Sequence, residues 1–189
     1  MGFDLMTSFA ASLLEHYRRV WSAGLEKVPF EEGPIGDLPA DFAVMACAPR
    51  ESRAMWTYAT LCMSQPTDAE PIELHLFSRS RADQLAELLV AMAHYHRTGS
   101  PLGLNHSVNF GRPWLPNSNC DHGLISLPYL DGPKLEWAEI ESRPVRFLWV
   151  IPITTEEVAF KRDKGVQALE ERFEEAHVAY TDPFRPSVV

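Results

Sequence analysis

Apolar residues recur every three or four positions near the beginning of the chain, which is the spacing of one face of an α-helix. The members of this series are Phe3, Met6, Phe9, Ala10, Leu13, Tyr17, Val20 and Trp21. The spacing predicts a long amphipathic first helix. Because such a helix must bury its apolar face, we expect it to pack against a sheet.

A second helical pattern follows in the middle of the chain. Its apolar positions are Leu85, Leu88, Leu89, Met92 and Tyr95. Ser80, with Asp83 three residues later, resembles the capping signal at the start of a helix. Gly99 and then Pro101 predict its end, because glycine commonly follows a helix and proline cannot continue one.

Strands are predicted where short apolar or alternating runs lie between turn residues. Residues 42–48 and 55–63 are expected to form a hairpin through the turn 49–53, and residues 72–77 to form another strand. Shorter strands separated by Pro- and Gly-rich turns are expected around Val108 and Phe110, at 123–127 and at 135–140.

The last third of the chain contains an uncharged run at 147–153, rich in β-branched and aromatic residues. This composition favours a strand that is covered on both faces. Pro152 cannot donate a ladder hydrogen bond, so we expect it at the end of the strand or in a bulge.

Two helical segments follow this strand. Either Thr154 or Thr155 can cap the first of them, with Glu156 and Glu157 in a solvated first turn near the positive end of the helix dipole. Gly165 is expected to interrupt the helix. An apolar stripe then continues through Val166, Leu169 and Phe173, and the opposite face carries Glu170, Glu171, Glu174 and Glu175.

The order of these elements predicts an α+β fold with a mixed, largely antiparallel sheet flanked by helices. With 189 residues, of which 46% are hydrophobic, the chain can bury one sizeable core. We therefore expect residues 1–189 to form a single domain, with two small lobes as the alternative arrangement.

Charge and targeting signals narrow the class of protein. The chain has a formal net charge of -9 and therefore lacks the excess of basic residues that is typical of a nucleic-acid binder. If this charge has a functional role, it favours a basic protein as partner. Asp4 and Thr7 interrupt the beginning of the chain too early for a secretory signal, and no window approaches a membrane span. These features predict a cytoplasmic protein that does not enter membranes.

The three cysteines predict free thiols in a reducing compartment. If the turn of the first hairpin is centred on Glu51, Cys47 lies opposite Met55 and far from Cys62. A disulfide between Cys47 and Cys62 is then disfavoured by geometry.

Candidate chemistry is sparse. Histidine and cysteine side chains gather in one part of the chain, at His94, His96, His106, Cys120 and His122. They lack the spacing of a metal site, and two helical histidines two residues apart point in different directions. Cys120 beside Asp121 and His122 has no supporting nucleophile motif, and no phosphate-binding glycine motif is present. The sequence thus favours a non-enzymatic protein without cofactor or metal.

Residues 105–119 have a composition typical of protein-binding surfaces, with asparagine, histidine and arginine between Phe110 and Trp114. Trp114 also fits a second interpretation, as an aromatic anchor of a loop in the core. The closing residues 185–189 are too short for a domain and fit a docked or frayed terminus.

Two pairs of segments resemble the suppressor of fused family, in its compact bacterial form. The first pair is FLWVIPITTEEVAFKRDKGVQAL and the terminal DPFRPSVV, and the second is ADQLAELLVAMAHYHRTG with GLNHSVNFGRPW. The resemblance covers residues 71–189 through these motifs, and residues 3–64 through the order of elements alone.

The resemblance implies a non-enzymatic α+β fold that binds other proteins. Animal members hold a short peptide of a transcription factor as an added β-strand between two lobes, so that edge hydrogen bonds supply affinity and side-chain pockets supply specificity. Their binding surface includes a tyrosine that corresponds to Tyr95 and an aspartate before a histidine, here Asn105 before His106. Because an amide replaces that carboxylate, the same partner is not expected.

Bacterial members resemble immunity proteins of toxin systems. The first hypothesis is therefore that the chain binds and neutralises a protein partner, such as a basic toxin domain. The second is a general peptide-binding or regulatory module that acts by β-strand addition without a toxin. An enzyme is a third class, for which no motif was found. Tyr95, Asn105, His106 and Trp114 are the candidate protein-binding residues.

Overall fold

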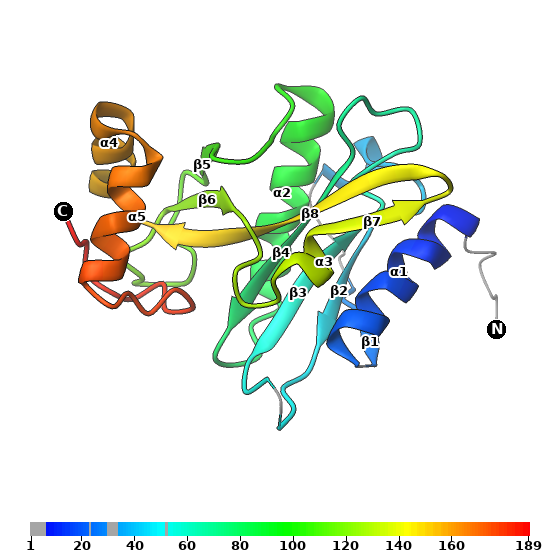
Figure 1. Ribbon diagram of the computed structural model, residues 1–189, viewed down its shortest axis with the longest axis horizontal. Helices are drawn as coiled ribbons and strands as arrows, with labels where there is room; N and C mark the ends of the chain where they lie inside the picture. Colours follow the sequence, from blue (N-terminus) through cyan, green and yellow to red (C-terminus); the bar gives the residue numbers. More distant parts are fainter. Residues whose placement is uncertain (1–6, 23, 30–33, 52) are drawn as a thin grey trace.

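One mixed, mostly antiparallel sheet runs through the computed structural model, which describes residues 7–22, 24–29, 34–51 and 53–189 (Figure 1). The strand order is β1-β2-β3-β4-β8-β6-β5, with β7 also paired to β8. Only the pairing of β4 with β8 is parallel among the described strands. The strands are β1 Leu25–Lys27, β2 Ala43–Cys47, β3 Trp56–Leu61, β4 Ile72–Ser78, β5 Ser107–Asn109, β6 His122–Ser126, β7 Trp137–Ile140 and β8 Arg143–Ile153. The predicted α+β fold is confirmed.

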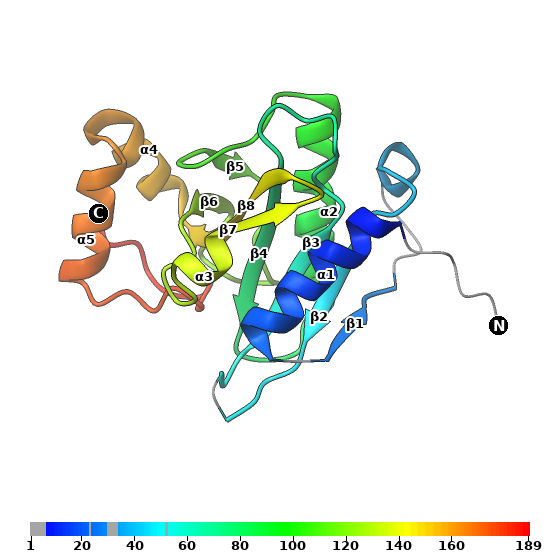
Figure 2. The same cartoon turned by 45° about the vertical axis from the view of Figure 1, so that its right-hand side comes forward.

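Helices cover both faces of this sheet. They are α1 Ser8–Trp21, the 3-10 helix η1 Pro34–Asp37, α2 Gln84–Thr98, α3 Pro133–Glu136, α4 Thr155–Lys164 and α5 Val166–Glu175. Side chains alternate between the faces of a strand, and in β8 this places Leu148 in the core beneath α2, whereas Phe147 packs with α1 and Trp149 with α5. Figure 2 shows α1 and α2 on opposite sides of β2, β3 and β4. None of the described helices combines the length and the apolar composition needed to cross a bilayer.

Helix α1 packs against the sheet as predicted. Thr7 caps its beginning, and Leu13 and Tyr17 are fully buried on its inner face. The Tyr17 hydroxyl donates to the Thr60 carbonyl of β3 at 3.0 Å, which satisfies its one polar atom in the core. The predicted apolar positions Phe3 and Met6 lie outside the described residues.

Strands β2 and β3 form the predicted hairpin, but its register differs from the expected one. Cys47 lies opposite Thr57 rather than Met55. The difference arises because the turn closes through paired backbone hydrogen bonds between Arg50 and Arg53, with irregular chain on either side. All three cysteines are free, as expected, and the structure also shows them to be buried.

Helix α2 begins at Gln84 with Asp83 in the N-cap position, so the predicted start at Ser80 is wrong. The prediction that Tyr95 belongs to the apolar face is also wrong, because its side chain is 46% exposed. His96 turns inward instead, and its Nδ1 accepts a hydrogen bond from the Leu102 backbone N–H at 2.9 Å. His96 therefore takes the buried position in the last turn, with the following loop supplying its polar partner.

Strand β8 begins four residues earlier than predicted, because β7 pairs with its first half and β6 with its second half. Pro152 is the second-last residue of the strand, which confirms a position at its end. Its carbonyl points away from β6 and accepts a hydrogen bond from Arg185 at 2.9 Å. The proline nitrogen faces the same side, where the pairing with β4 has already ended at Trp149, so no ladder donor is missing.

Thr154 caps α4 in a reciprocal capping box with Glu157, as the sequence predicted for one of the two threonines. The expectation that Glu157 is solvated is wrong, because its side chain is fully buried. The two guanidinium nitrogens of Arg185 donate to its two oxygens at 2.6 and 2.8 Å. The backbone N–H groups of Thr154 and Val188 also donate to this carboxylate, at 3.0 and 3.2 Å. A buried charge pair therefore docks the end of the chain.

The docked tail also holds the loop that precedes β6. The Pro183 carbonyl accepts hydrogen bonds from the backbone N–H groups of Asn119 and Cys120 at 3.1 and 3.0 Å. The Asn119 side-chain amide donates in turn to the carbonyls of Phe184 and Arg185. Of the two expectations for the terminus, the structure confirms the docked one.

A second buried carboxylate, Glu73, lies on the α1 side of β4. Its oxygens accept hydrogen bonds from the hydroxyl groups of Thr60 and Ser64 and from the Ser64 backbone N–H at 3.0 Å. Burial raises the pKa of Glu73 from 4.5 to about 7, although these hydrogen bonds oppose the shift. Near neutral pH the core therefore contains a carboxyl group that is close to its titration midpoint.

The ion pair with Glu157 predicts that Arg185→Ala lowers the free energy of unfolding by about 3 kcal/mol, because a buried carboxylate loses its counter-charge. Urea unfolding at pH 7 measures the change. Arg172→Ala is the matched control, since Arg172 forms an exposed pair with Glu175, and it should cost less than about 1 kcal/mol. Equal effects of the two substitutions would contradict a special role for the buried pair.

The raised pKa of Glu73 predicts a pH-dependent stability. The folded protein retains this proton to a higher pH than the unfolded chain, so its contribution is complete below pH 4.5 and is lost as the pH rises through about 7. The difference in unfolding free energy between wild type and Glu73→Gln should change by ~3 kcal/mol between pH 4 and pH 8. The exposed Glu70→Gln is the control, for which this difference should stay flat. A flat difference for Glu73→Gln would show that the carboxyl titrates normally.

Candidate functional site

Strand β5 forms one end of the main sheet path, and it directly follows the candidate residues Asn105 and His106. In the part of the chain that the structure describes, it pairs with β6 on one side only, with Ser107 opposite Leu124 and Asn109 opposite His122. An end strand exposes backbone donors and acceptors on its free side, which is the geometry that accepts an additional strand.

The register shows which backbone groups of β5 are free. The His106 carbonyl accepts from Ile125, and the Phe110 N–H donates to Asp121, so the backbone groups of these residues face β6. Because the backbone direction alternates along an antiparallel strand, the N–H and C=O groups of Ser107 and Asn109 face outward. Among the described residues, no strand pairs with them there.

Asn105 and His106 are both exposed at the beginning of this edge. Asn105 has a positive φ of 68°, a conformation that asparagine tolerates better than most residues. Its N–H donates to the Ile125 carbonyl at 2.8 Å, and its own carbonyl accepts from the Lys161 ammonium of α4. The backbone of Asn105 is thereby held from two sides, whereas its amide side chain faces solvent.

Trp114 is 1% exposed and anchors the loop after β5 in the core. Its indole Nε1 donates to the His122 carbonyl at 2.7 Å, and its ring meets the Phe110 ring edge-on at 5.6 Å. Of the two interpretations of Trp114, the structure therefore favours the loop anchor. The buried Trp114 side chain therefore offers no surface to a partner, and it supports β5 from the core.

Tyr95 lies near the end of α2 with an exposed ring, and the ring covers Gly99 after the helix. No hydrogen bond joins Tyr95 to Asn105 or His106 in the described structure. The loop after β5 does return to this helix, where the Arg112 guanidinium pairs with Glu87 at 2.7 Å. Asn105 and His106 are thus neighbours, and Tyr95 is a separate exposed aromatic group.

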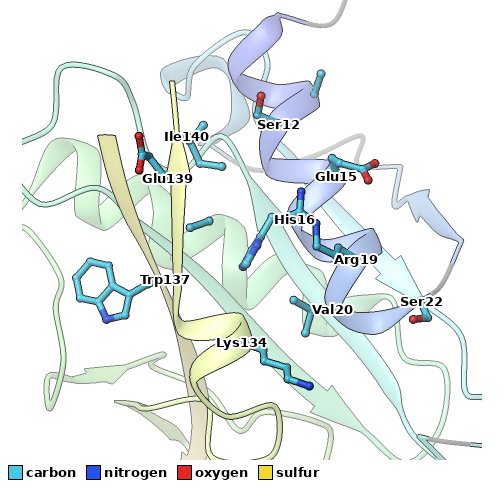
Figure 3. Close-up of a pocket in the computed structure, with 12 residues that line it drawn as sticks. Ser12, Glu15, His16, Arg19, Val20, Ser22, Lys134, Trp137, Glu139 and Ile140 are labelled. Atoms are coloured by element: carbon cyan, nitrogen blue, oxygen red, sulfur yellow. The ribbon is translucent and has the colours of Figure 1, made fainter. Parts of the chain in front are cut away.

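A hollow of about 920 Å³ lies between α1 and β7 (Figure 3). Glu15 and Arg19 of α1 line it, together with Lys134 and Glu139 from the other side. His16 is buried beneath this hollow, with its Nε2 3.0 Å from the Leu135 carbonyl, and burial lowers its pKa. The lining carries charges of both signs and His16 already has a backbone partner, so the hollow favours no ligand of one charge.

The histidines and cysteine that the sequence brought together do not form one site. His94 contacts Asp37, whereas His96 faces the opposite direction and binds the Leu102 N–H, as predicted for two helical positions two apart. In the part of the chain that the structure describes, no group of three or more potential ligands could hold a metal ion. His122 pairs with Asp121 at 2.6 Å.

Cys120 does not have the character of a nucleophile. Its side chain is fully buried, and burial raises the pKa of its thiol to about 12. A thiol with this pKa carries almost no thiolate at neutral pH, and the thiolate is the reactive form. Neither the environment of Cys120 nor its accessibility supports covalent catalysis.

Sequence reasoning missed Lys161, which joins α4 to the edge by contacting the Asn105 carbonyl and the Ser107 hydroxyl. Its only sequence signal is a cation in the last turn of a predicted helix, a position that normally indicates a favourable interaction with the helix dipole. The free edge of β5 was also not identifiable, because strand order is a property of the assembled sheet.

Comparison with protein families gives one result that covers most of the chain. Residues 36–186 match the family described as "Suppressor of fused protein (SUFU)". No curated protein sequence matches the chain.

Solved structures with the same fold include bacterial and animal proteins. A putative suppressor of fused homolog from Neisseria gonorrhoeae FA 1090 is 30% identical, with a TM-score of 0.83 over 96% of this chain and 97% of that chain. A chain of the Sufu-Fu complex is 12% identical, with a TM-score of 0.69 over 95% of this chain and 91% of that one. Drosophila Suppressor of Fused is also 12% identical at a TM-score of 0.69, over 94% of this chain but only 50% of that one.

The chain of the Sufu-Fu complex and the Drosophila protein share the fold, and this chain spans about half the length of the Drosophila protein. The bacterial homolog shares fold, length and a substantial part of the sequence. The family match includes α2, the β5 edge, β8, α4 and the docked tail as far as Pro186, which are the segments that carried the resemblance. The chain belongs to the suppressor of fused family.

Proposed function

We propose that this protein is a non-enzymatic binding module that captures an extended segment of another protein as an additional strand beside β5. The observation that carries the proposal is the outward direction of the Ser107 and Asn109 backbone groups at a sheet end. A partner strand would exchange hydrogen bonds with both residues, and main-chain hydrogen bonds of this kind supply affinity with little dependence on partner sequence.

Asn105 and His106 would contribute specificity at the beginning of the edge. Both side chains are exposed, and the backbone of Asn105 is already fixed by Ile125 and Lys161. A fixed backbone lowers the conformational cost of binding, because less freedom is lost when the partner arrives. We assign Tyr95 as a further exposed contact, and Trp114 as the buried support of the site.

The protein-bound state of a relative supports the choice of a protein as the partner. A structurally similar chain was crystallised as the Sufu-Fu complex. At 12% identity, the likeness between the two chains shows a shared fold and does not identify the partner of this chain. In addition, Asn105 stands where the family resemblance implies an aspartate. The three free, buried thiols also support a reducing compartment, for which we propose the cytoplasm.

Strand addition at β5 predicts that Ser107→Pro weakens partner capture by about tenfold or more. Proline removes an outward N–H and places a ring in the path of the added strand. The measurement is a pull-down from native cells with the wild-type protein as bait, identification of the retained protein, and titration of that protein against each variant. Ser107→Ala is the matched control, because it keeps the backbone donor and should bind within about twofold of wild type.

Thermal unfolding checks that Ser107→Pro remains folded, which is expected since edge strands tolerate proline on their free side. Tyr95→Ala enters the same titration and should reduce affinity without changing the unfolding temperature. A folded Ser107→Pro variant that binds the identified partner like wild type would overturn strand addition at this edge.

A second candidate function, supported by the net charge of -9, is the neutralisation of a basic toxin domain. Opposite net charges accelerate encounter, and rapid capture suits an immunity protein. This function predicts a neighbouring gene for a basic toxin domain whose product co-elutes with the chain in gel filtration. The association rate should fall steeply between 50 and 500 mM salt. The absence of such a neighbour, or an association rate independent of salt, would contradict the toxin hypothesis and leave strand addition standing.

A further inference from the structure

A smaller hollow of about 290 Å³, here called the α5 pocket, lies between α5, strands β6 and β8, and the loop that precedes α3. In Figure 1, α5 is the orange helix beside the end of β8. Buried Leu124, Trp149 and Phe173 form its apolar base. Tyr129, Leu130 and Tyr180 line it further. None of the residues assigned to strand addition belongs to this pocket.

Two carboxylates also line the α5 pocket. Glu170 and Glu174 lie one helical turn apart on α5, and neither forms an ion pair with a cation in the described part of the chain. Like charges at this spacing disfavour the helix slightly. No lysine, arginine or histidine lines the pocket. The charge of Arg185 also reaches this region, but Arg185 is already paired with Glu157, so the two carboxylates leave net negative charge beside the apolar base.

The negative potential of Glu170 and Glu174 also acts on the two tyrosines of the pocket, Tyr129 and Tyr180. The Tyr129 hydroxyl donates to Glu170 at 3.3 Å. Burial raises the pKa of Tyr129 and of Tyr180, and the charges of Glu170 and Glu174 raise both further. A negative potential that disfavours a phenolate favours a cation at the same place.

The rings of Tyr180 and Trp149 offer faces to such a cation, whereas the Arg185 guanidinium already lies 5.2 Å from the centre of the Phe173 ring. The Tyr180 ring lies 5.7 Å from the Trp149 ring, and it meets the Phe173 ring edge-on at 5.7 Å. Aromatic faces attract lysine and arginine head groups, and the attraction is larger where water is excluded. The apolar base can in addition cover the methylene stem of a long basic side chain.

An unpartnered donor provides an independent indication of a ligand. Trp149 is 2% exposed and lines the α5 pocket, yet its indole Nε1 has no hydrogen-bond partner among the described residues. A buried indole N–H usually finds an acceptor. Because this Nε1 atom is itself buried, an occupant of the α5 pocket changes the environment of the indole N–H without having to contact it.

We propose that the α5 pocket receives the side chain of a lysine or arginine from the protein partner. This inference rests on the proposed function in one respect, namely that the partner is a protein. A protein side chain is favoured over a free cation because Tyr129 and Leu130 are 58% and 54% exposed at the pocket, where a protein surface would cover them. The net charge of -9 favours the same class of partner.

The test is a titration of the full-length protein with N-acetyl-lysine methylamide, followed by NMR at the Trp149 indole N–H, whose resonance Trp149→Phe identifies. We expect saturable shifts of this resonance with the lysine probe, and none with the uncharged N-acetyl-norleucine methylamide. Glu170→Gln combined with Glu174→Gln should weaken probe binding about tenfold. Glu171→Gln combined with Glu175→Gln removes the same charge from the same helix outside the pocket, and it should bind within about twofold of wild type.

The outcomes separate this inference from strand addition. Ser107→Pro should bind the lysine probe like wild type, whatever it does to the partner. If Ser107→Pro no longer binds the partner but the lysine probe does not shift the Trp149 resonance, only the assignment of the α5 pocket is wrong. Equal binding of the lysine and norleucine probes would also overturn it. Tighter binding of free choline than of the lysine probe would assign the pocket to a small organic cation instead of a protein side chain.

Discussion

The buried pair of Glu157 and Arg185 is the interaction on which the arrangement of the proposed binding edge depends. Both charges are withdrawn from water, and each would be costly without the other. Their pairing joins the end of β8, the beginning of α4 and the terminal residues. The docked tail then holds Asn119 and Cys120, and the loop containing them returns from β5 to β6. The edge is thus supported by a contact between residues far from it in the sequence.

The sheet explains why binding is proposed at its end and beside α5. The central strands have helices on both faces, so their side chains serve the core. Two of the places where polar groups lack partners in the described chain lie at its surface: the outer backbone of β5, and the carboxylates of the α5 pocket beside the Trp149 indole. Unpartnered groups of this kind gain most from a ligand, because binding adds hydrogen bonds or charge pairs without breaking existing ones. An extended, basic segment of a protein has the chemistry for both.

Much of the fold could be predicted from local patterns. Helical spacing located α1, α2 and α5, and the threonine and glutamate after β8 located the start of α4, because periodicity and capping depend on residues close in the sequence. The errors have a common cause. Tyr95 was placed inward, Glu157 was placed in solvent, and Cys47 was paired with the wrong residue. In each case the deciding partner, whether Leu102, Arg185 or the closing bonds of a turn, became apparent only in the folded chain.

The sequence by itself determined the α+β class, the family resemblance and the region around Asn105 and His106 as a candidate surface, since these depend on element order and on short motifs. The tertiary structure decided that β5 ends the sheet, that Trp114 supports the site from the core, and that Glu170 and Glu174 meet Tyr129, Trp149 and Tyr180 around one pocket. The physical reason is that edges, burial and electrostatic fields arise from segments packed together across the sheet, and no local spacing of residues encodes which segments become neighbours.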